Sequence, residues 1–243
     1  MNSQQKGEYG ENAEDFFRYC INLACITRDS DLQRDGLGRL GSFIQFNEKV
    51  KREAVKGCDE DLANYCLGLD RVAAALHAEI SMWLALKADK PDDAWNELVI
   101  AQTAYAEAIK ARENFEPMQE QIERLDEVER VVFPPQVYLS MGTVVWSKIC
   151  SICGQEYEKC DHISGKPYWG ELCYTILRDV LPNHVAIVTE PANKMCRVVY
   201  FDVEGGRRNR MTWKIEPKPE GTAIDPEGGL VATGILATAH PEY

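Results

Sequence analysis

The residues best suited to chemistry lie in one short segment, residues 150–162, which read C-S-I-C-G-Q-E-Y-E-K-C-D-H. Cys150 and Cys153 form a C-x2-C pair with a glycine directly after it, the usual composition of a metal-binding knuckle. Cys160 and His162 add two ligand-type side chains after a gap of six residues, long enough to reverse the chain. Three thiolates and one imidazole make up the tetrahedral shell of a structural zinc site.

A lone C-x2-C pair would be a weak signal, because thiol redox motifs also contain it. Here a C-x-H pair follows within ten residues and glycines surround the segment, which favours zinc over unlinked cysteines. Cys173 or His184 could replace His162 as the fourth ligand, and the sequence leaves this choice open. Four protein ligands leave no open coordination position, so we expect a zinc ion that holds structure and does no chemistry.

The composition is that of a soluble globular protein, with 45% hydrophobic and 27% charged residues among 243. The chain has no run of ~20 apolar residues that could span a membrane, and its polar start, M-N-S-Q-Q-K-G-E, does not resemble a signal peptide. Nine cysteines, an odd number without an export signal, argue against a disulfide scaffold. We therefore expect a cytoplasmic protein without membrane contact.

The net charge of −12 is unevenly distributed. Residues 1–130 hold 16 Lys and Arg against 26 Asp and Glu, whereas residues 131–243 hold 11 against 13. An acidic surface repels phosphate backbones, so nucleic-acid binding is disfavoured. The residues that a nucleic-acid-binding zinc module would use are basic and lie in the second half: Lys148, Lys159, Lys166, Arg207, Arg208, Arg210 and Lys214. A solvated turn between two strands accounts more simply for the cluster that begins at Arg207.

Residues 12–132 follow a helical pattern and are expected to form a bundle of five helices, after a flexible N-terminus at residues 1–11. The helices are predicted at 13–26, 37–56, 59–88, from Pro91 onward, and 117–130. The third is the clearest, because apolar residues recur at spacings of three and four after the N-cap residue Asp59. Because its exterior is acidic, we expect the bundle to bind a protein partner or to self-associate.

The Pro134-Pro135 pair ends the helical pattern, so residues 133–216 are predicted to form a small zinc-stapled, β-rich domain. Residues 137–146 are expected to form a strand or a hairpin bent about Gly142. Further strands are expected at 184–189, 197–203 and 211–215, a short helix at 171–180, and a loosely ordered tail at 217–243. A domain of about 80 residues has a modest core, for which a structural metal is the expected support. The predicted fold class is α+β.

Two further motifs flank the cysteine segment: Ser140-Met141-Gly142, and H-V-A-I-V-T-E-P-A-N at residues 184–193. With the segment between them, residues 136–200 resemble the C-terminal part of phage prohead maturation proteases. The resemblance implies a serine protease with Ser140 as nucleophile, which needs a histidine to take its proton.

This sequence departs from the family's pattern at two points. Ala186 stands where the second motif of the family has a serine. The one histidine upstream of Ser140, His77, lies in a helical segment. Because zinc would occupy His162, His184 is left as the candidate base.

Three hypotheses follow. The leading one is a non-enzymatic, zinc-binding, two-domain protein of phage or anti-phage context that binds a protein partner or takes part in assembly. The second is a prohead-type serine protease, active or degenerate, that uses Ser140 and His184. The third is the nucleic-acid-binding zinc module.

Overall fold

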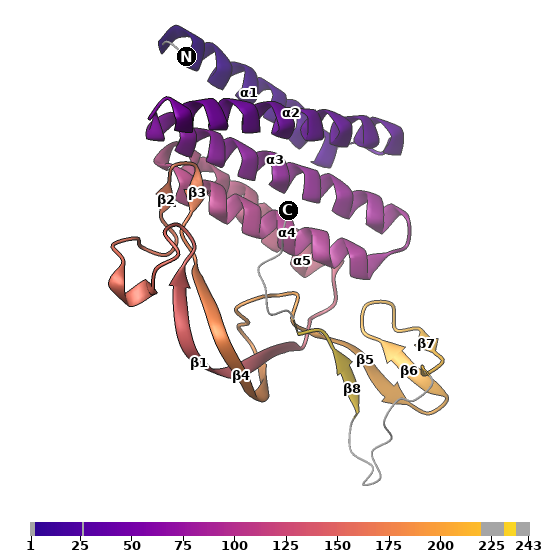
Figure 1. The fold of residues 1–243 in the computed structure, drawn as a ribbon. Coiled ribbons are helices and arrows are strands. Elements are labelled where there is room, and N and C mark those ends of the chain that lie inside the picture. The colour runs from indigo at the N-terminus through magenta and orange to yellow at the C-terminus, as the bar shows by residue number, and fades with distance from the viewer. Residues whose placement is uncertain (1–2, 26, 220–230, 237–243) are drawn as a thin grey trace. The chain divides into compact units, whose positions relative to one another are not determined.

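The computed structural model describes residues 3–25, 27–219 and 231–236, which have the predicted α+β fold (Figure 1). Helices come first in the chain and short strands follow. Contacts divide the chain into two compact units. The first comprises residues 1–126 and 147–178, and the second comprises residues 127–146 and 179–242.

The helices surround α3, which is buried along most of its length. Their bounds are α1 Ser3–Cys25, α2 Ser30–Lys56, α3 Glu60–Lys87, α4 Pro91–Ala111, the 3-10 helix η1 Glu113–Met118, and α5 Gln119–Val132. α3 packs against α2 and α4 and also contacts α1. Because α3 is apolar on nearly every side, its sequence suits this central position.

The predicted starts of α3 and α4 are confirmed. The Asp59 side chain accepts a hydrogen bond from the backbone N–H of Leu62 at 3.1 Å, as an N-cap does. Pro91 is the first residue of α4, where its missing N–H costs no hydrogen bond.

Two predicted helix starts were placed too late. α1 already begins at Ser3, so residues 3–11 are helical and not a flexible N-terminus. α2 begins at Ser30, because its glycines do not interrupt it. A Cβ added to Gly36 would lie 2.5 Å from Leu23 Cδ1, so the missing side chain lets α1 and α2 approach closely. A tertiary contact thus outweighs the poor helix propensity of glycine.

Residues 147–178, which contain the cysteine segment, belong to the compact unit of the helices. The compact units therefore do not follow the boundary expected at residue 133. The strands β2 (Pro167–Tyr168) and β3 (Glu171–Leu172) form a small hairpin in this segment. Leu172 lies in a hydrophobic cluster with Leu67 of α3 and Ala111 of α4, which explains why the segment is part of the first unit.

The predicted helix at residues 171–180 is wrong. These residues form β3 and the start of β4 (Thr175–Val188), which pairs with β1 (Tyr138–Cys150) in a two-stranded sheet. The apolar residues of this stretch fit either period, and pairing with β1 fixes the extended conformation. β1 is one continuous strand, and the predicted strand at 184–189 lies almost wholly within β4.

The second unit contains a four-stranded antiparallel sheet in the order β7-β6-β5-β8. Its strands are β5 Val198–Val203, β6 Gly206–Asn209, β7 Ile215–Glu216 and β8 Ala232–Gly234. The predicted strand at 211–215 is reduced to β7. β8 pairs with β5, so the expected loose tail contains a strand at residues 232–234, while residues 220–230 and 237–243 lie outside the described residues.

The helices in the described ranges are too polar or too short to cross a membrane.

Candidate metal centre

The first half of the site is a tight turn at the end of β1. Cys150 is the last residue of that strand, and its backbone oxygen accepts a hydrogen bond from the N–H of Gly154 at 2.9 Å. Gly154 has a φ of 69°, a left-handed conformation that favours glycine. The backbone N–H groups of Ile152 and Cys153 point at the Cys150 sulfur and donate hydrogen bonds to it. The C-x2-C-G sequence therefore forms the predicted knuckle.

The second half of the site follows the 3-10 helix η2 (Tyr157–Lys159). Cys160 comes directly after this helix, and the ring of His162 meets the ring of Tyr168 edge-on at 4.6 Å between centroids. The Tyr168 hydroxyl also accepts a hydrogen bond from the backbone N–H of Ile163 at 2.9 Å. Tyr168 thus restrains the orientation of His162, a supporting role that the sequence reasoning missed.

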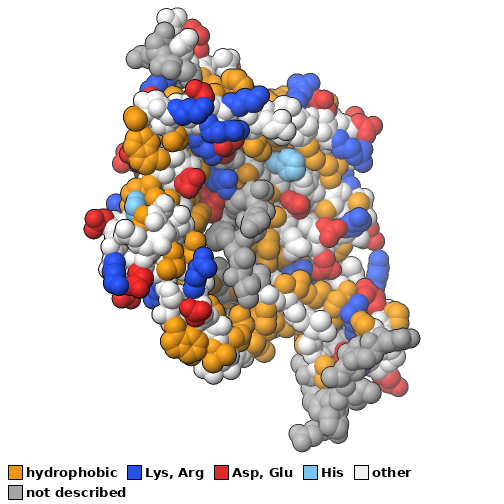
Figure 2. All heavy atoms as spheres, in the orientation of Figure 1, with side chains coloured by type: hydrophobic (Ala, Val, Ile, Leu, Met, Phe, Trp, Pro, Cys, Tyr) orange, Lys and Arg blue, Asp and Glu red, His pale blue; other side chains and the backbone are white. Residues whose placement is uncertain are grey.

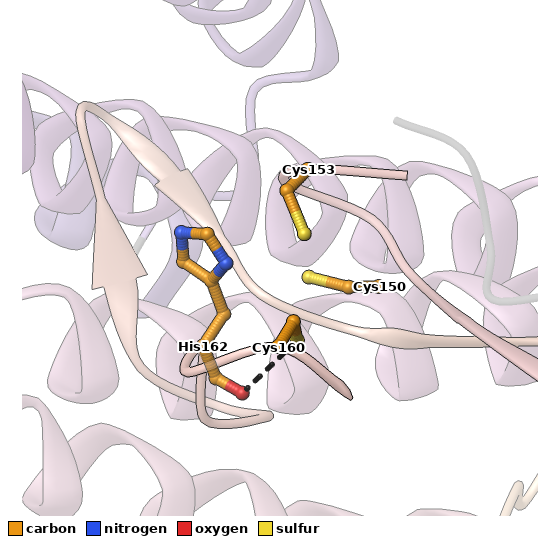
Figure 3. Close-up of side chains that lie close together, drawn as sticks. All are labelled: Cys150, Cys153, Cys160 and His162. Atoms are coloured by element: carbon orange, nitrogen blue, oxygen red, sulfur yellow. Dashed lines mark hydrogen bonds between the residues drawn. The ribbon is translucent and has the colours of Figure 1, made fainter. Parts of the chain in front are cut away.

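The four predicted ligands lie together (Figure 3). One ligand atom from each of Cys150, Cys153, Cys160 and His162 lies within 4.8 Å of all the others. Ligand atoms around a tetrahedral zinc ion are roughly 3.5–3.8 Å apart, so a small contraction would enclose one ion. In Figure 3 the sulfurs of Cys150 and Cys153 and one ring nitrogen of His162 face a common point.

His162 Nδ1 provides an independent indication of a ligand. This nitrogen is buried and has no hydrogen-bond partner among the described residues. A buried polar atom without a partner costs free energy, and coordination of a metal ion would remove that cost. The group can therefore hold a metal ion, and its thiolate-rich donor set suits a soft or borderline cation.

The electrostatics of the knuckle favour the thiolate that a metal needs. Burial acts to raise the pKa of the Cys150 thiol, but hydrogen bonds from the backbone of Cys153 and Ile152 and from neighbouring thiols outweigh it and bring this pKa to about 6. Burial is the main cause that raises the pKa of Cys160, and the nearby Cys150 sulfur adds to it. Cys150 is therefore readily deprotonated. The cluster as a whole disfavours several thiolates at once, because their negative charges are close together.

Of the two alternative ligands, only Cys173 lies near the group. Its sulfur is 3.7 Å from that of Cys150, and both cysteines are fully buried. Burial raises the pKa of Cys173 to about 11, and the neighbouring Cys150 contributes to this rise. His184 lies elsewhere, on the exposed part of β4, and is not a member of the group.

The segment that contains the ligands is attached to the helices by polar contacts as well as by Leu172. The backbone N–H groups of Trp169 and Gly170 donate to Glu60 Oε1 at 3.2 Å and Asn64 Oδ1 at 2.8 Å. The Tyr174 hydroxyl, one residue after Cys173, donates to Glu107 Oε1 at 2.7 Å. These contacts involve residues distant in sequence, and no local pattern could have identified them.

The residues of the protease hypothesis lie on paired strands. Ser140 is half-buried on β1, and His184 is exposed on β4. The His184 ring lies beside Gly142, where an added Cβ would be 2.2 Å from Cε1 of that ring. Ser140 and His184 form no hydrogen bond with each other within the described part of the chain.

Most of the basic residues of the third hypothesis interact within the protein. The guanidinium groups of Arg207, Arg208 and Arg210 lie over the rings of Tyr200, Trp213 and Phe201. Arg207 also forms an ion pair with Glu216 at 3.5 Å, and Lys159 forms one with Glu156 at 2.5 Å.

Comparison of the chain with protein-family models, with curated proteins and with solved structures gives no match.

Proposed function

We propose that this chain is a non-enzymatic zinc protein of phage or anti-phage context that binds a protein partner or takes part in assembly. The ion would be structural zinc, held by Cys150, Cys153, Cys160 and His162. With all four positions taken by protein ligands, the ion would keep no site for water or substrate. The resemblance of residues 136–200 to prohead proteases supports the phage context.

The zinc assignment rests on three sulfurs and a ring nitrogen of His162 that lie within 4.8 Å of one another. It is supported by His162 Nδ1, which is buried and has no hydrogen-bond partner in the described ranges. Only three elements of at most three residues, η2, β2 and β3, lie between β1 and β4. Segments of this size rarely stay folded without a metal or disulfide. Zinc binding would therefore stabilise the fold of residues 147–178 and their attachment to α3 and α4.

Partner binding through the helices is supported by exposed apolar side chains on α2. Leu32 is 44% exposed and Phe46 is 54% exposed, although most other large apolar residues of the bundle are buried. Figure 2 shows acidic, basic and apolar side chains interspersed on the face of the molecule that it presents. An acidic helical surface with a few exposed apolar side chains suits a protein partner better than a nucleic acid.

The test is the metal content of the purified chain by mass spectrometry, together with thermal unfolding, for the wild type and Cys153→Ser. We expect one zinc per chain in the wild type and a loss of both zinc and stability in the variant. Cys58→Ser is the matched control, because Cys58 is also exposed but lies outside the group. Wild-type protein purified without any metal, and unable to bind added zinc, would overturn the zinc assignment.

A serine protease is the second candidate, supported by the pairing of β1 and β4 and by the position of the His184 ring beside Gly142. Its test is hydrolysis of a casein substrate by the wild type and by Ser140→Ala and His184→Ala. Activity that both substitutions abolish, while zinc content is unchanged, would establish this candidate. Equal rates for all three proteins would eliminate it.

A further inference from the structure

The sheet β7-β6-β5-β8 of the second unit (Figure 1) has one face that combines arginines with aromatic and apolar side chains. Directly opposite residues of an antiparallel sheet share a face, so Phe201 of β5, Arg208 of β6 and Ile215 of β7 form one row across it. The guanidinium group of Arg208 lies over the Trp213 ring, 5.4 Å from its centroid. That of Arg210 lies over the Phe201 ring, 5.1 Å from its centroid. We refer to these five residues as the Phe201 face.

On the opposite face of the sheet, acidic residues neutralise the cations. Asp202 and Arg207 are adjacent to Phe201 and Arg208 along their strands, and successive side chains of a strand alternate between faces. Arg207 forms an ion pair with Glu216 at 3.5 Å, and Lys218 forms one with Asp202 at 2.7 Å. These acidic side chains are therefore not available to the arginines of the Phe201 face.

The arginines of the Phe201 face have no acidic partner. Arg208 Nε is buried without a hydrogen-bond partner, and its guanidinium group forms no ion pair with any residue in the described ranges. Arg210 donates a hydrogen bond to the carbonyl oxygen of Pro135, but it too forms no ion pair there. The Phe201 face therefore retains positive charge, in a chain whose net charge is −12.

Trp213 is exposed although its backbone conformation is unfavourable. Its side chain is 59% exposed, and that of Ile215 is 51% exposed. The φ of Trp213 is 57°, in the left-handed region where bulky side chains are rare and glycine is favoured. An exposed aromatic residue that costs backbone free energy is typical of a binding surface.

We propose that the Phe201 face binds a short acidic segment of a partner protein. Guanidinium groups bind carboxylates through paired N–H donors at their edge, and these donors remain accessible when the flat side of the group lies on a ring. Trp213 and Ile215 would contact an apolar side chain of the same segment. The proposal rests on the partner binding proposed above, and it assigns an acidic partner to the sheet of the second unit.

Charge and ring geometry favour a protein partner over a nucleic acid. The net charge of −12 repels a phosphate backbone, and two arginines neutralise few phosphates. Single-stranded nucleic acids stack their bases on free aromatic faces. Here a guanidinium group already lies over one side of the Trp213 ring and of the Phe201 ring. A short acidic segment has a lower charge density, so the charge of the chain opposes its binding less.

The test is fluorescence anisotropy of a labelled peptide titrated with the full chain at low salt. The probe has four Glu-Asp-Leu repeats, and an uncharged control peptide has four Gln-Asn-Leu repeats. A labelled oligothymidylate with the same charge as the probe tests the nucleic-acid alternative. We expect the wild type to bind the acidic peptide with a Kd below about 100 µM, and to bind the other two at least tenfold more weakly.

Three variants locate the site. Arg208→Gln should raise the Kd of the acidic peptide at least tenfold, because it removes a charge-assisted interaction. Arg207→Gln is the matched control, since Arg207 is the neighbouring arginine on the opposite face, and its Kd should stay within about threefold of the wild type. Trp213→Gly separates binding from folding. Glycine suits the left-handed backbone, so Tm should not fall, whereas loss of the ring should raise the Kd about tenfold.

The outcomes distinguish this surface from the zinc assignment. A wild type that does not bind the acidic peptide at about 100 µM overturns the proposal, and one zinc per chain in that protein would leave the metal assignment intact. Peptide binding by a chain that holds no zinc would support the Phe201 face and refute the metal assignment. Tighter binding of the oligothymidylate than of the peptide also overturns the proposal. Equal weakening by Arg208→Gln and Arg207→Gln would contradict it, because the two arginines lie on opposite faces.

Discussion

The identity of the fourth ligand can be decided by comparing His162→Ala with Cys173→Ser. Both residues are at the site: His162 supplies one of the four converging ligand atoms, and Cys173 Sγ is 3.7 Å from Cys150 Sγ. Two thiolates that share one zinc ion are roughly 3.8 Å apart, so the distance from Cys150 would also allow Cys173 to be the fourth ligand. The buried Nδ1 without a partner among the described residues favours His162, because Cys173 already has Cys150 as a neighbour.

The expected magnitudes differ between the two variants. Structural zinc binds with an apparent free energy of roughly 10–16 kcal/mol from four ligands, so the loss of one costs about 3 kcal/mol, or a hundredfold or more in affinity. We expect this loss for His162→Ala. Cys173→Ser removes a neighbour of a ligand and should lower the affinity about tenfold, as such supporting residues do.

The assay is competition for zinc against a chelator, with cobalt(II) absorption as a second measurement. Thiolate-to-cobalt bands grow with the number of sulfur ligands, so wild type and Cys173→Ser should both give the spectrum of three sulfurs. If Cys173→Ser loses one sulfur and a hundredfold in affinity while His162→Ala loses little, the site has four cysteine ligands and our reasoning from Nδ1 is refuted. Cys58→Ser again serves as the control that retains every ligand.

Two further predictions concern the helices. Arg124 donates to both carboxylate oxygens of the fully buried Glu79 at 2.7 Å. Arg124→Ala should therefore lower the free energy of unfolding by about 3–5 kcal/mol in urea titrations, because it leaves a buried charge unpaired, whereas a Glu79→Met/Arg124→Met double variant should lose much less. Burial raises the pKa of Cys66 to about 12, so alkylation at pH 8 followed by mass spectrometry should label the exposed Cys58 and leave Cys66 unmodified until the protein unfolds. Labelling of both at equal rates in the folded protein would contradict the packing of α3.

Local sequence was sufficient for features that depend on neighbouring residues. The knuckle follows from the spacing of Cys150 and Cys153 and from a glycine at the left-handed position after them. The start of α3 follows from Asp59, whose side chain caps the third residue after it. In each case the interacting atoms are within a few residues of one another, so the local sequence is sufficient to predict the structure.

Tertiary structure decided the features that depend on distant partners. Residues 171–180 do not form a helix, although their own apolar spacing also fits one, because β3 pairs with β2 and β4 pairs with β1. The cysteine segment packs on α3 and α4 through Leu172 and the contact from Tyr174 to Glu107, 67 residues away, and no local signal marks either. The sequence therefore determined which residues can bind a metal. The tertiary structure decided which elements these residues support, because strand pairing and burial stabilise contacts between residues far apart in the chain.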